Sequence, residues 1–412
     1  QAFVFNPASA ASGLGAALRS AEPTMGGGAS ACWQKQHHVT SNVEDVDGDA
    51  YCEIFPVWSI AITTNMRQLA AATSANVIVL WCLKNLKELI SLKGHVDTIW
   101  KVSYSPDDSI LASASSDGTV RLWEVDNGMP IMIFPRRHAA WVTCLAWSPD
   151  SKRLATGGAD SKIIIWDAQE AANVSRDLRD EKTRFDVDNE DLLTLQQEAA
   201  EACLPLLYWQ AHEKGIQEIQ FAPSDAKQLV SIGREGTLAV WDAETSSLDC
   251  RLQGHIGTMC AMSIHPQNEE IIATGGEDHT VRIWDLRDID PSATAATRSR
   301  EKAMGYNLQH FTLKGHEAGV TCVRFSRDGR LLASGSKDCE VRIWHPDMNG
   351  PTLHARFVAA DAWVKDLQWM TDQHHLYTAA NDGHIFAFNV PTKYWIKKEV
   401  AKRQKKKKKA SE

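Results

Sequence analysis

Short apolar runs recur along most of the chain, and Gly, Asp, Ser or Asn separates each run from the next. Runs such as 320–325, 331–336 and 341–344 are rich in β-branched residues, and the polar breaks come too often for helices. The pattern therefore predicts short strands joined by tight turns. Six of the runs end in tryptophan, at Trp81, Trp123, Trp166, Trp241, Trp284 and Trp344.

These tryptophans follow a nearly constant period. Successive intervals are 42 or 43 residues, apart from two longer ones of 75 and 60, and Phe388 follows the last tryptophan by 44 residues. A period in this range is typical of repeat proteins, whose units pack against their neighbours. It predicts seven units within a single domain over residues 31–396. The two long intervals predict insertions at 168–205 and 287–308.

Most units combine a Gly-His or a lone His, an apolar strand, an Asp turn and a terminal Trp. This combination resembles the WD-repeat family of β-propellers over roughly residues 50–395. The resemblance implies an all-β fold, a seven-bladed β-propeller. The long intervals add two loop insertions to this fold, and the composition of the two ends predicts disordered termini. The first and seventh units are degenerate. The strand that closes the ring is expected near 33–40, with 394–400 as the alternative.

The resemblance also implies a structural hydrogen-bond network of His, Ser or Thr, Asp and Trp within each blade. A buried carboxylate and a buried imidazole must be paired, so these groups are interpreted as structural. An intrinsic hydrolase is disfavoured, because an enzyme needs one nucleophile in one cleft and not five near-copies of it. The network residues are His95, Ser113, Asp117, Trp123, His138, Thr156, Asp160, Trp166, His212, Ser231, Glu235, Trp241, His255, Thr274, Asp278, Trp284, His316, Ser334, Asp338 and Trp344.

Residues that the repeat itself does not require are better candidates for binding. Trp141 and Trp363 stand just before inner strands, and Arg234 and Lys337 stand just before turn acids. Both kinds of position are expected at the rim of the central channel, where exposed Trp and Arg side chains contribute strongly to binding. The remaining rim positions are Ser116, Ala159, Glu277 and Asn381. Trp58 and Trp100, one place further along their strands, are expected to pack between blades.

Charge is distributed unevenly. The chain carries −8, but residues 397–412 contribute nine basic and two acidic side chains, which leaves −15 for the rest. The basic run, with Lys405, Lys406 and Lys407 at its centre, predicts a disordered tail. This tail could bind a polyanion, which would be nucleic acid, an acidic protein or an anionic membrane, or it could be a nuclear-import signal. The alternative is a tail that only keeps the chain soluble. The insertion 168–205 holds ten acidic and four basic residues, and 189–203 has helical spacing. We expect this insertion to bind a partner.

Several other classes of function find little support. No apolar run approaches the ~20 residues of a membrane span. The nine cysteines are scattered singly, so an intracellular location, cytoplasmic and/or nuclear, is expected. Neither a phosphate-binding glycine loop nor a metal-ligand spacing stands out, and no cofactor is expected. Residues 1–30 are expected to be disordered, and 25–30 would match an N-myristoylation motif if Met25 were the initiator.

The sequence therefore predicts a non-enzymatic scaffold or adaptor for protein–protein interaction within a multiprotein complex. The alternative is a substrate-recognition subunit of a cullin-RING ubiquitin ligase. That alternative depends on Arg287, since Trp284-Asp285-Leu286-Arg287 resembles the motif by which some WD-repeat proteins dock on such ligases.

Overall fold

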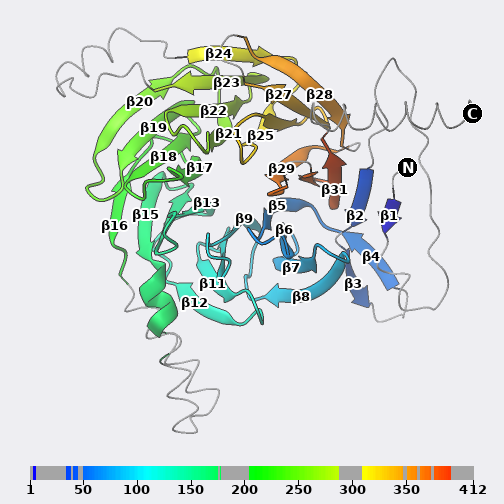
Figure 1. Ribbon diagram of the computed structural model, residues 1–412. Helices are drawn as coiled ribbons and strands as arrows, with labels where there is room; N and C mark the ends of the chain where they lie inside the picture. Colours follow the sequence, from blue (N-terminus) through cyan, green and yellow to red (C-terminus); the bar gives the residue numbers. More distant parts are fainter. Residues whose placement is uncertain are drawn as a thin grey trace, which may run out of the picture.

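The protein forms a ring of seven antiparallel sheets around a central channel (Figure 1). This arrangement confirms the predicted seven-bladed β-propeller. We number the blades in chain order, so that β5–β8 form the first blade and β29–β31 belong to the seventh. The computed structural model describes residues 3–5, 34–38, 40–44, 50–174, 177, 204–286, 309–346, 350–359, 362–372 and 375–390.

Each blade begins with the strand that lines the channel and continues outward. The inner strands are β5 (Val57–Ile62), β9 (Ile99–Tyr104), β13 (Val142–Trp147), β17 (Ile216–Phe221), β21 (Met259–Ile264), β25 (Val320–Phe325) and β29 (Val364–Trp369). The second strands are β6 (Gln68–Thr73), β10 (Ile110–Ser115), β14 (Arg153–Gly158), β18 (Gln228–Gly233), β22 (Ile271–Gly276), β26 (Leu332–Ser336) and β30 (His375–Ala380).

Two further strands complete each sheet. The third strands are β7 (Val77–Cys82), β11 (Val120–Glu124), β15 (Lys162–Asp167), β19 (Thr237–Asp242), β23 (Thr280–Asp285), β27 (Glu340–His345) and β31 (His384–Asn389). The outer strands of the first six blades are β8 (Lys87–Lys93), β12 (Pro130–Phe134), β16 (Leu207–Gln210), β20 (Leu248–Gln253), β24 (Gln309–Lys314) and β28 (Thr352–Val358).

The seventh blade takes its outer strand from the beginning of the chain. Strand β2 (Gln34–His38) pairs antiparallel with β31, so the ring is closed by the segment that precedes the first unit. The alternative closure by 394–400 lies outside the described residues. Strand β1 (Phe3–Phe5) pairs in parallel with β2, and β3 (Thr40–Glu44) pairs with β4 (Ala50–Ile54) as a separate hairpin. The short strand β1 was not predicted, because composition had favoured disorder for 1–30.

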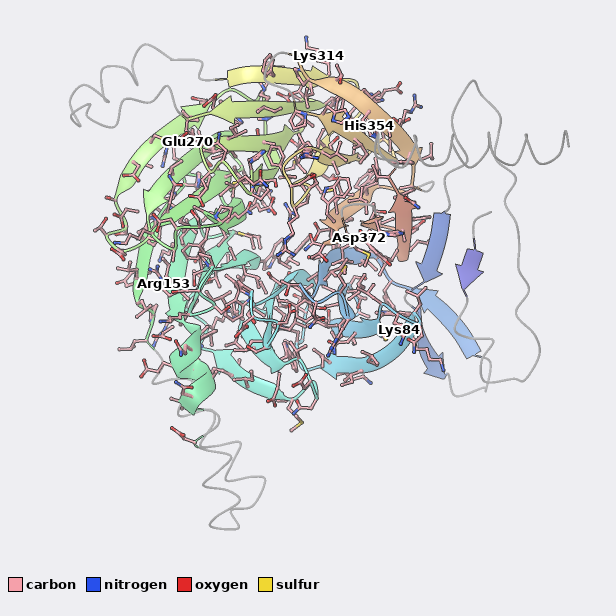
Figure 2. The ribbon with its side chains drawn as sticks, in the orientation of Figure 1. Lys84, Arg153, Glu270, Lys314, His354 and Asp372 are labelled. Atoms are coloured by element: carbon pink, nitrogen blue, oxygen red, sulfur yellow. The ribbon has the colours of Figure 1, made fainter. Side chains whose placement is uncertain are left out.

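Apolar side chains fill the spaces between neighbouring blades all around the ring (Figure 2). One cluster joins the first and second blades through Leu80 and Leu111, and another joins the first and seventh through Ile60 and Ala379. Every other pair of adjacent blades shares a similar cluster. Burial of apolar surface between sheets therefore holds the ring together.

A short helix over residues 168–174 follows β15 and opens the first insertion. It begins where the Asp167 carboxylate accepts a hydrogen bond from the backbone N–H of Glu170, a typical N-cap. Ala168, Ala171 and Ala172 are buried against the cluster between the second and third blades. The sequence had placed helical character at 189–203. That stretch, most of the rest of the insertion and all of 287–308 lie outside the described residues.

Candidate functional site

The predicted network residues come together in five blades. In the second blade, His95 Nδ1 lies 2.8 Å from the Asp117 carboxylate, and His95 Nε2 lies 2.8 Å from Ser113 Oγ. The same hydroxyl accepts a hydrogen bond of 2.9 Å from Trp123 Nε1. The third to sixth blades repeat these contacts, with Glu235 in place of Asp in the fourth.

The hydroxyl groups of these sets are not accessible to a substrate in the folded chain. Ser113 is fully buried, and its oxygen is occupied by both the imidazole and the indole. Burial is the largest influence on His95 and lowers its pKa, although the carboxylate of Asp117 opposes that shift. The arrangement ties together the loop, the second strand, the turn and the third strand of one blade.

Every inner strand carries a β-bulge at the same place. Val57 pairs with Thr73 and Ser59 pairs with Ala72, so Trp58 has no partner on β6. The same shift of register occurs in the other six blades. A bulge leaves one residue unpaired and redirects its side chain. The unpaired residues are Trp58, Trp100, Thr143, Gln217, Cys260, Thr321 and Lys365.

We call these seven residues the bulge ring. All of them line one cavity of about 200 Å³ at the mouth of the channel, and all are partly exposed. The ring is not symmetric. Trp58, Trp100 and Lys365 come from the first, second and seventh blades, which are neighbours, whereas the other blades contribute Thr, Gln or Cys. Large side chains therefore crowd one half of the mouth.

Beside this half of the ring, tryptophans from four consecutive blades form a continuous arc. The rings of Trp58 and Trp100 are 4.6 Å apart, and Trp100 stacks on Trp141 at 6.1 Å. The Lys365 ammonium lies 4.2 Å from the centre of the Trp58 ring and 5.1 Å from that of Trp363. We call the four tryptophans the tryptophan arc. Trp58 and Trp100 pack on each other across two blades, as expected, but they also line the channel mouth.

Backbone hydrogen bonds hold the predicted rim positions at one level. The N–H of Ala159 donates to the carbonyl of Trp141 at 2.8 Å, and that of Asn381 donates to the carbonyl of Trp363 at 2.9 Å. Equivalent bonds join the turn to the start of the inner strand in the other blades. The residue before each turn acid and the residue before each inner strand therefore lie side by side.

The predicted rim residues differ in their exposure. Trp141 is 50% exposed and Trp363 is 46% exposed, and Arg234 is also exposed. Lys337 lies 3.6 Å from Glu277 and 5.5 Å from the centre of the Trp363 ring. Ser116, in contrast, is buried and accepts a hydrogen bond of 2.6 Å from Trp100 Nε1. Arg287 and Lys405, Lys406 and Lys407 lie outside the described residues.

Below the bulge ring, four charged side chains cross the channel. Lys101 lies 3.1 Å from Asp366 and 3.7 Å from Glu218, while Arg324 lies 2.6 Å from Glu218 and 3.6 Å from Asp366. We call this closed ring of alternating charges the charge quartet. Burial alone would raise the pKa of Asp366, but the charges of Lys101 and Arg324, together with hydrogen bonds from Ser59 and Lys101, outweigh burial and lower it.

Sequence reasoning missed the quartet. The sequence signal that could have indicated it is the presence of charged residues within inner strands that are otherwise largely apolar. Lys101 and Asp366 are 265 positions apart and Glu218 and Arg324 are 106 apart, so their pairing depends on closure of the ring.

The two insertions leave from the face opposite the tryptophan arc. Asp167, the last residue of β15, pairs with Arg153 at the start of β14. Leu154 pairs with Trp147 at the end of β13, far along the strand from Trp141. The third strand of the fifth blade ends in the same way at Asp285. The points at which the two predicted insertions begin, Asp167 and Asp285, therefore lie on the face opposite the tryptophan arc.

Four segments match the family model described as WD domain, G-beta repeat, at residues 86–124, 128–167, 246–285 and 308–345. The chain belongs to the WD-repeat family. The matched segments correspond to the second, third, fifth and sixth units of this WD-repeat protein, which are the units with a complete His, Ser or Thr, Asp and Trp set.

Several curated relatives share the repeats. The chain is 23% identical to apoptotic protease-activating factor 1 of Rattus norvegicus, over 83% of this chain and 29% of that protein. It is 26% identical to WD repeat-containing protein 37 of Mus musculus, over 70% of this chain and 48% of that protein. It is 24% identical to nuclear distribution protein PAC1 of Arthroderma benhamiae, over 71% of this chain and 59% of that protein. The chain spans less than two thirds of the length of each relative, and these differently named proteins identify no subfamily.

Among the described residues, no helix has the length and apolar character needed to cross a membrane. Within the same residues, His, Cys, Asp and Glu side chains form no group of three or more that could hold a metal ion.

Proposed function

We propose that this WD-repeat protein is a non-enzymatic scaffold that binds a partner protein on the tryptophan arc. WD-repeat propellers in general serve as surfaces for protein interaction, and the family assignment supports that general role. The finer assignment to one face depends on the residues that the fold itself does not need. Those residues gather at the channel mouth, on neighbouring blades.

The observation that carries the proposal is the exposure of two large indoles beside positive charge. About half of Trp141 and of Trp363 faces solvent, although each is among the largest apolar side chains available to a protein. Trp and Arg anchors at the centre of an interface typically contribute 2 kcal/mol or more when a partner buries them. Trp100 stacks on Trp141 and contacts Trp58, while Lys337 and Lys365 lie over the Trp363 ring, so both exposed indoles already have packing partners before binding.

The proposal includes two further contact regions on the same chain. The acidic insertion leaves from the opposite face and would meet a second partner there. The basic residues of 397–412 would bind a polyanion through counterion release, with affinity that falls as salt rises. A scaffold with separate contact regions can hold several components together at once.

The test is affinity purification of the tagged full chain from cells, with quantitative comparison of variants. Trp141→Ala/Trp363→Ala is expected to lose specific partners by about tenfold or more, since each lost anchor costs on the order of 2 kcal/mol. The matched control is Leu89→Ala/Leu353→Ala on outer strands, whose side chains are 46% and 47% exposed. Equal recovery of every partner by both double variants would refute the proposal, provided that both variants unfold at the wild-type temperature.

A further inference from the structure

We propose that the bulge ring binds a carboxylate side chain of the partner protein, between the Lys365 ammonium and the Trp58 indole N–H. This inference rests on the proposed function and specifies the chemistry that the tryptophan arc would recognise. The occupant is an acidic segment of a partner, an Asp or Glu flanked by apolar residues.

The first observation is that the charge of Lys365 is not compensated. Among the residues that the structure describes, no carboxylate pairs with its ammonium, which instead lies over the rings of Trp58 and Trp363. Burial is the largest influence on Lys365 and lowers its pKa, and the nearby charge of Lys337 acts in the same direction. A half-buried cation beside another cation favours the arrival of an anion.

The second observation is an unused hydrogen-bond donor on a residue that lines the same cavity. Trp58 Nε1 is buried and has no hydrogen-bond partner among the described residues. The neighbouring Trp100 Nε1, by comparison, donates to Ser116 at 2.6 Å. A buried donor without an acceptor is unfavourable, and an acceptor from a partner would remove that cost. Trp58 and Lys365 thus present two donors that lack an acceptor, and one carboxylate offers two oxygens.

The third observation concerns the floor of the cavity. The charge quartet beneath the bulge ring is neutral, and each of its cations already contacts both of its carboxylates. Arg324 is therefore not available for the bidentate contacts that phosphate groups favour. A single free ammonium and a single indole N–H are better suited to a carboxylate.

The size of the site also indicates one side chain. The cavity holds about 200 Å³, which is less than the roughly 300–1,000 Å³ of typical small-molecule pockets. Trp141 and Trp363 stand at the rim above it and would cover the apolar neighbours of an inserted acid. The large side chains and the pocket thus lie close together, as do the residues that dominate binding in known interfaces.

The probe for this site is a phage-displayed library of random 12-residue peptides, selected on the immobilised full chain. We expect enriched peptides to share an Asp or Glu next to apolar residues. A synthetic peptide of the enriched sequence should bind about tenfold more weakly to Lys365→Met than to the wild type, since a charge-assisted hydrogen bond contributes about 1.5–3 kcal/mol. The same loss is expected when its acid is replaced by the corresponding amide.

Matched variants separate this inference from the proposed function. Lys214→Met removes an exposed lysine from the same face and should change affinity by less than about twofold, because that charge lies outside the bulge ring. Trp58→Phe keeps an aromatic ring beside Trp100 but removes the indole N–H, and it should weaken binding of the same peptide.

Peptides that depend on Trp141 and Trp363 but not on Lys365 would contradict the carboxylate site and leave the scaffold proposal unaffected. Acidic peptides held by the basic tail would bind Lys365→Met normally, and that result, or no enrichment at all, would also overturn the inference.

Discussion

A single buried imidazole links four segments of each blade that has a complete set. In the second blade, His95 donates from Nδ1 to the ionised Asp117 and accepts at Nε2 from Ser113, whose oxygen accepts from Trp123. Each group uses its hydrogen-bonding capacity, so the burial of four polar groups carries little penalty. The repeat of spacing and residue type made these sets predictable from the sequence.

Removal of one carboxylate from this network should destabilise its blade. Asp117→Ala leaves the His95 N–H without an acceptor and also removes contacts to Thr119, so we expect a loss of about 1–3 kcal/mol in unfolding free energy. Urea denaturation followed by tryptophan fluorescence measures the change. The control Asp126→Ala alters an exposed acid of the same blade. Identical denaturation midpoints for the two variants would contradict the structural role of the set.

The same imidazoles predict the response of stability to acid. Burial lowers the pKa of His95, His212, His255 and His316 below 6.5, so the unfolded chain takes up these protons first as pH falls. Stability should therefore be constant between pH 8 and 7, then decrease as pH falls below about 6.5. A further decrease is expected below about pH 4, because the partner carboxyl groups of Asp117 and Asp278 also have lowered pKa values. Thermal unfolding across this range measures the profile, and a rise in stability toward pH 5 would contradict it.

At the level of elements, the strands were largely predictable and their local irregularities were not. The sequence placed the first inner strand at 57–62, where β5 lies, because apolar alternation continues to its end. A one-residue bulge leaves no such pattern, so nothing in the sequence distinguished Trp58 and Trp100, which line the mouth, from buried neighbours. The helix at 168–174 was missed as well, since seven residues are too few for a helical period to emerge.

Strand β2 is the element on which closure of the ring depends. Its pairing with β31 joins residues 34–38 to 384–388 across almost the full described chain. Lys35→Pro/Gln36→Pro removes two neighbouring N–H groups, and at least one of them belongs to the ladder with β31. We expect a loss of at least about 1 kcal/mol relative to Lys35→Ala/Gln36→Ala, which keeps both N–H groups. Chemical denaturation compares the two, and equal midpoints would show that β2 is not needed for closure.

At the level of the whole molecule, the charge quartet connects four blades across the channel. Asp366→Asn would leave Lys101 and Arg324 facing a single carboxylate, with an expected loss of about 3–5 kcal/mol because a buried charge loses its partner. The double variant Lys101→Met/Asp366→Asn restores neutrality and should recover part of that loss. Calorimetric unfolding measures the stability of both variants relative to the wild type. Wild-type stability of Asp366→Asn would mean that the quartet contributes nothing to the ring.

The molecule as a whole has two different faces. The tryptophan arc and the bulge ring occupy one face, and both insertions leave from the other. The repeated sequence pattern accounts for the ring. The features that distinguish this chain from other propellers are the residues and segments that do not follow the repeat. Trp141 and Trp363 could be selected as rim candidates from their positions in the repeat. Lys365 could not, because its role depends on a bulge and on neighbours from two other blades.

The most direct test of the partner-binding face is photo-crosslinking from single positions in the full chain. Benzoylphenylalanine at position 363, on the tryptophan arc, is expected to crosslink partner proteins in cells. The same residue at position 353, on outer strand β28, replaces a side chain of nearly equal exposure and should crosslink few or none. Specific adducts from 363 and not from 353 are the predicted result. The same adducts from both positions, or adducts from 353 alone, would contradict the claim that this face binds the partner.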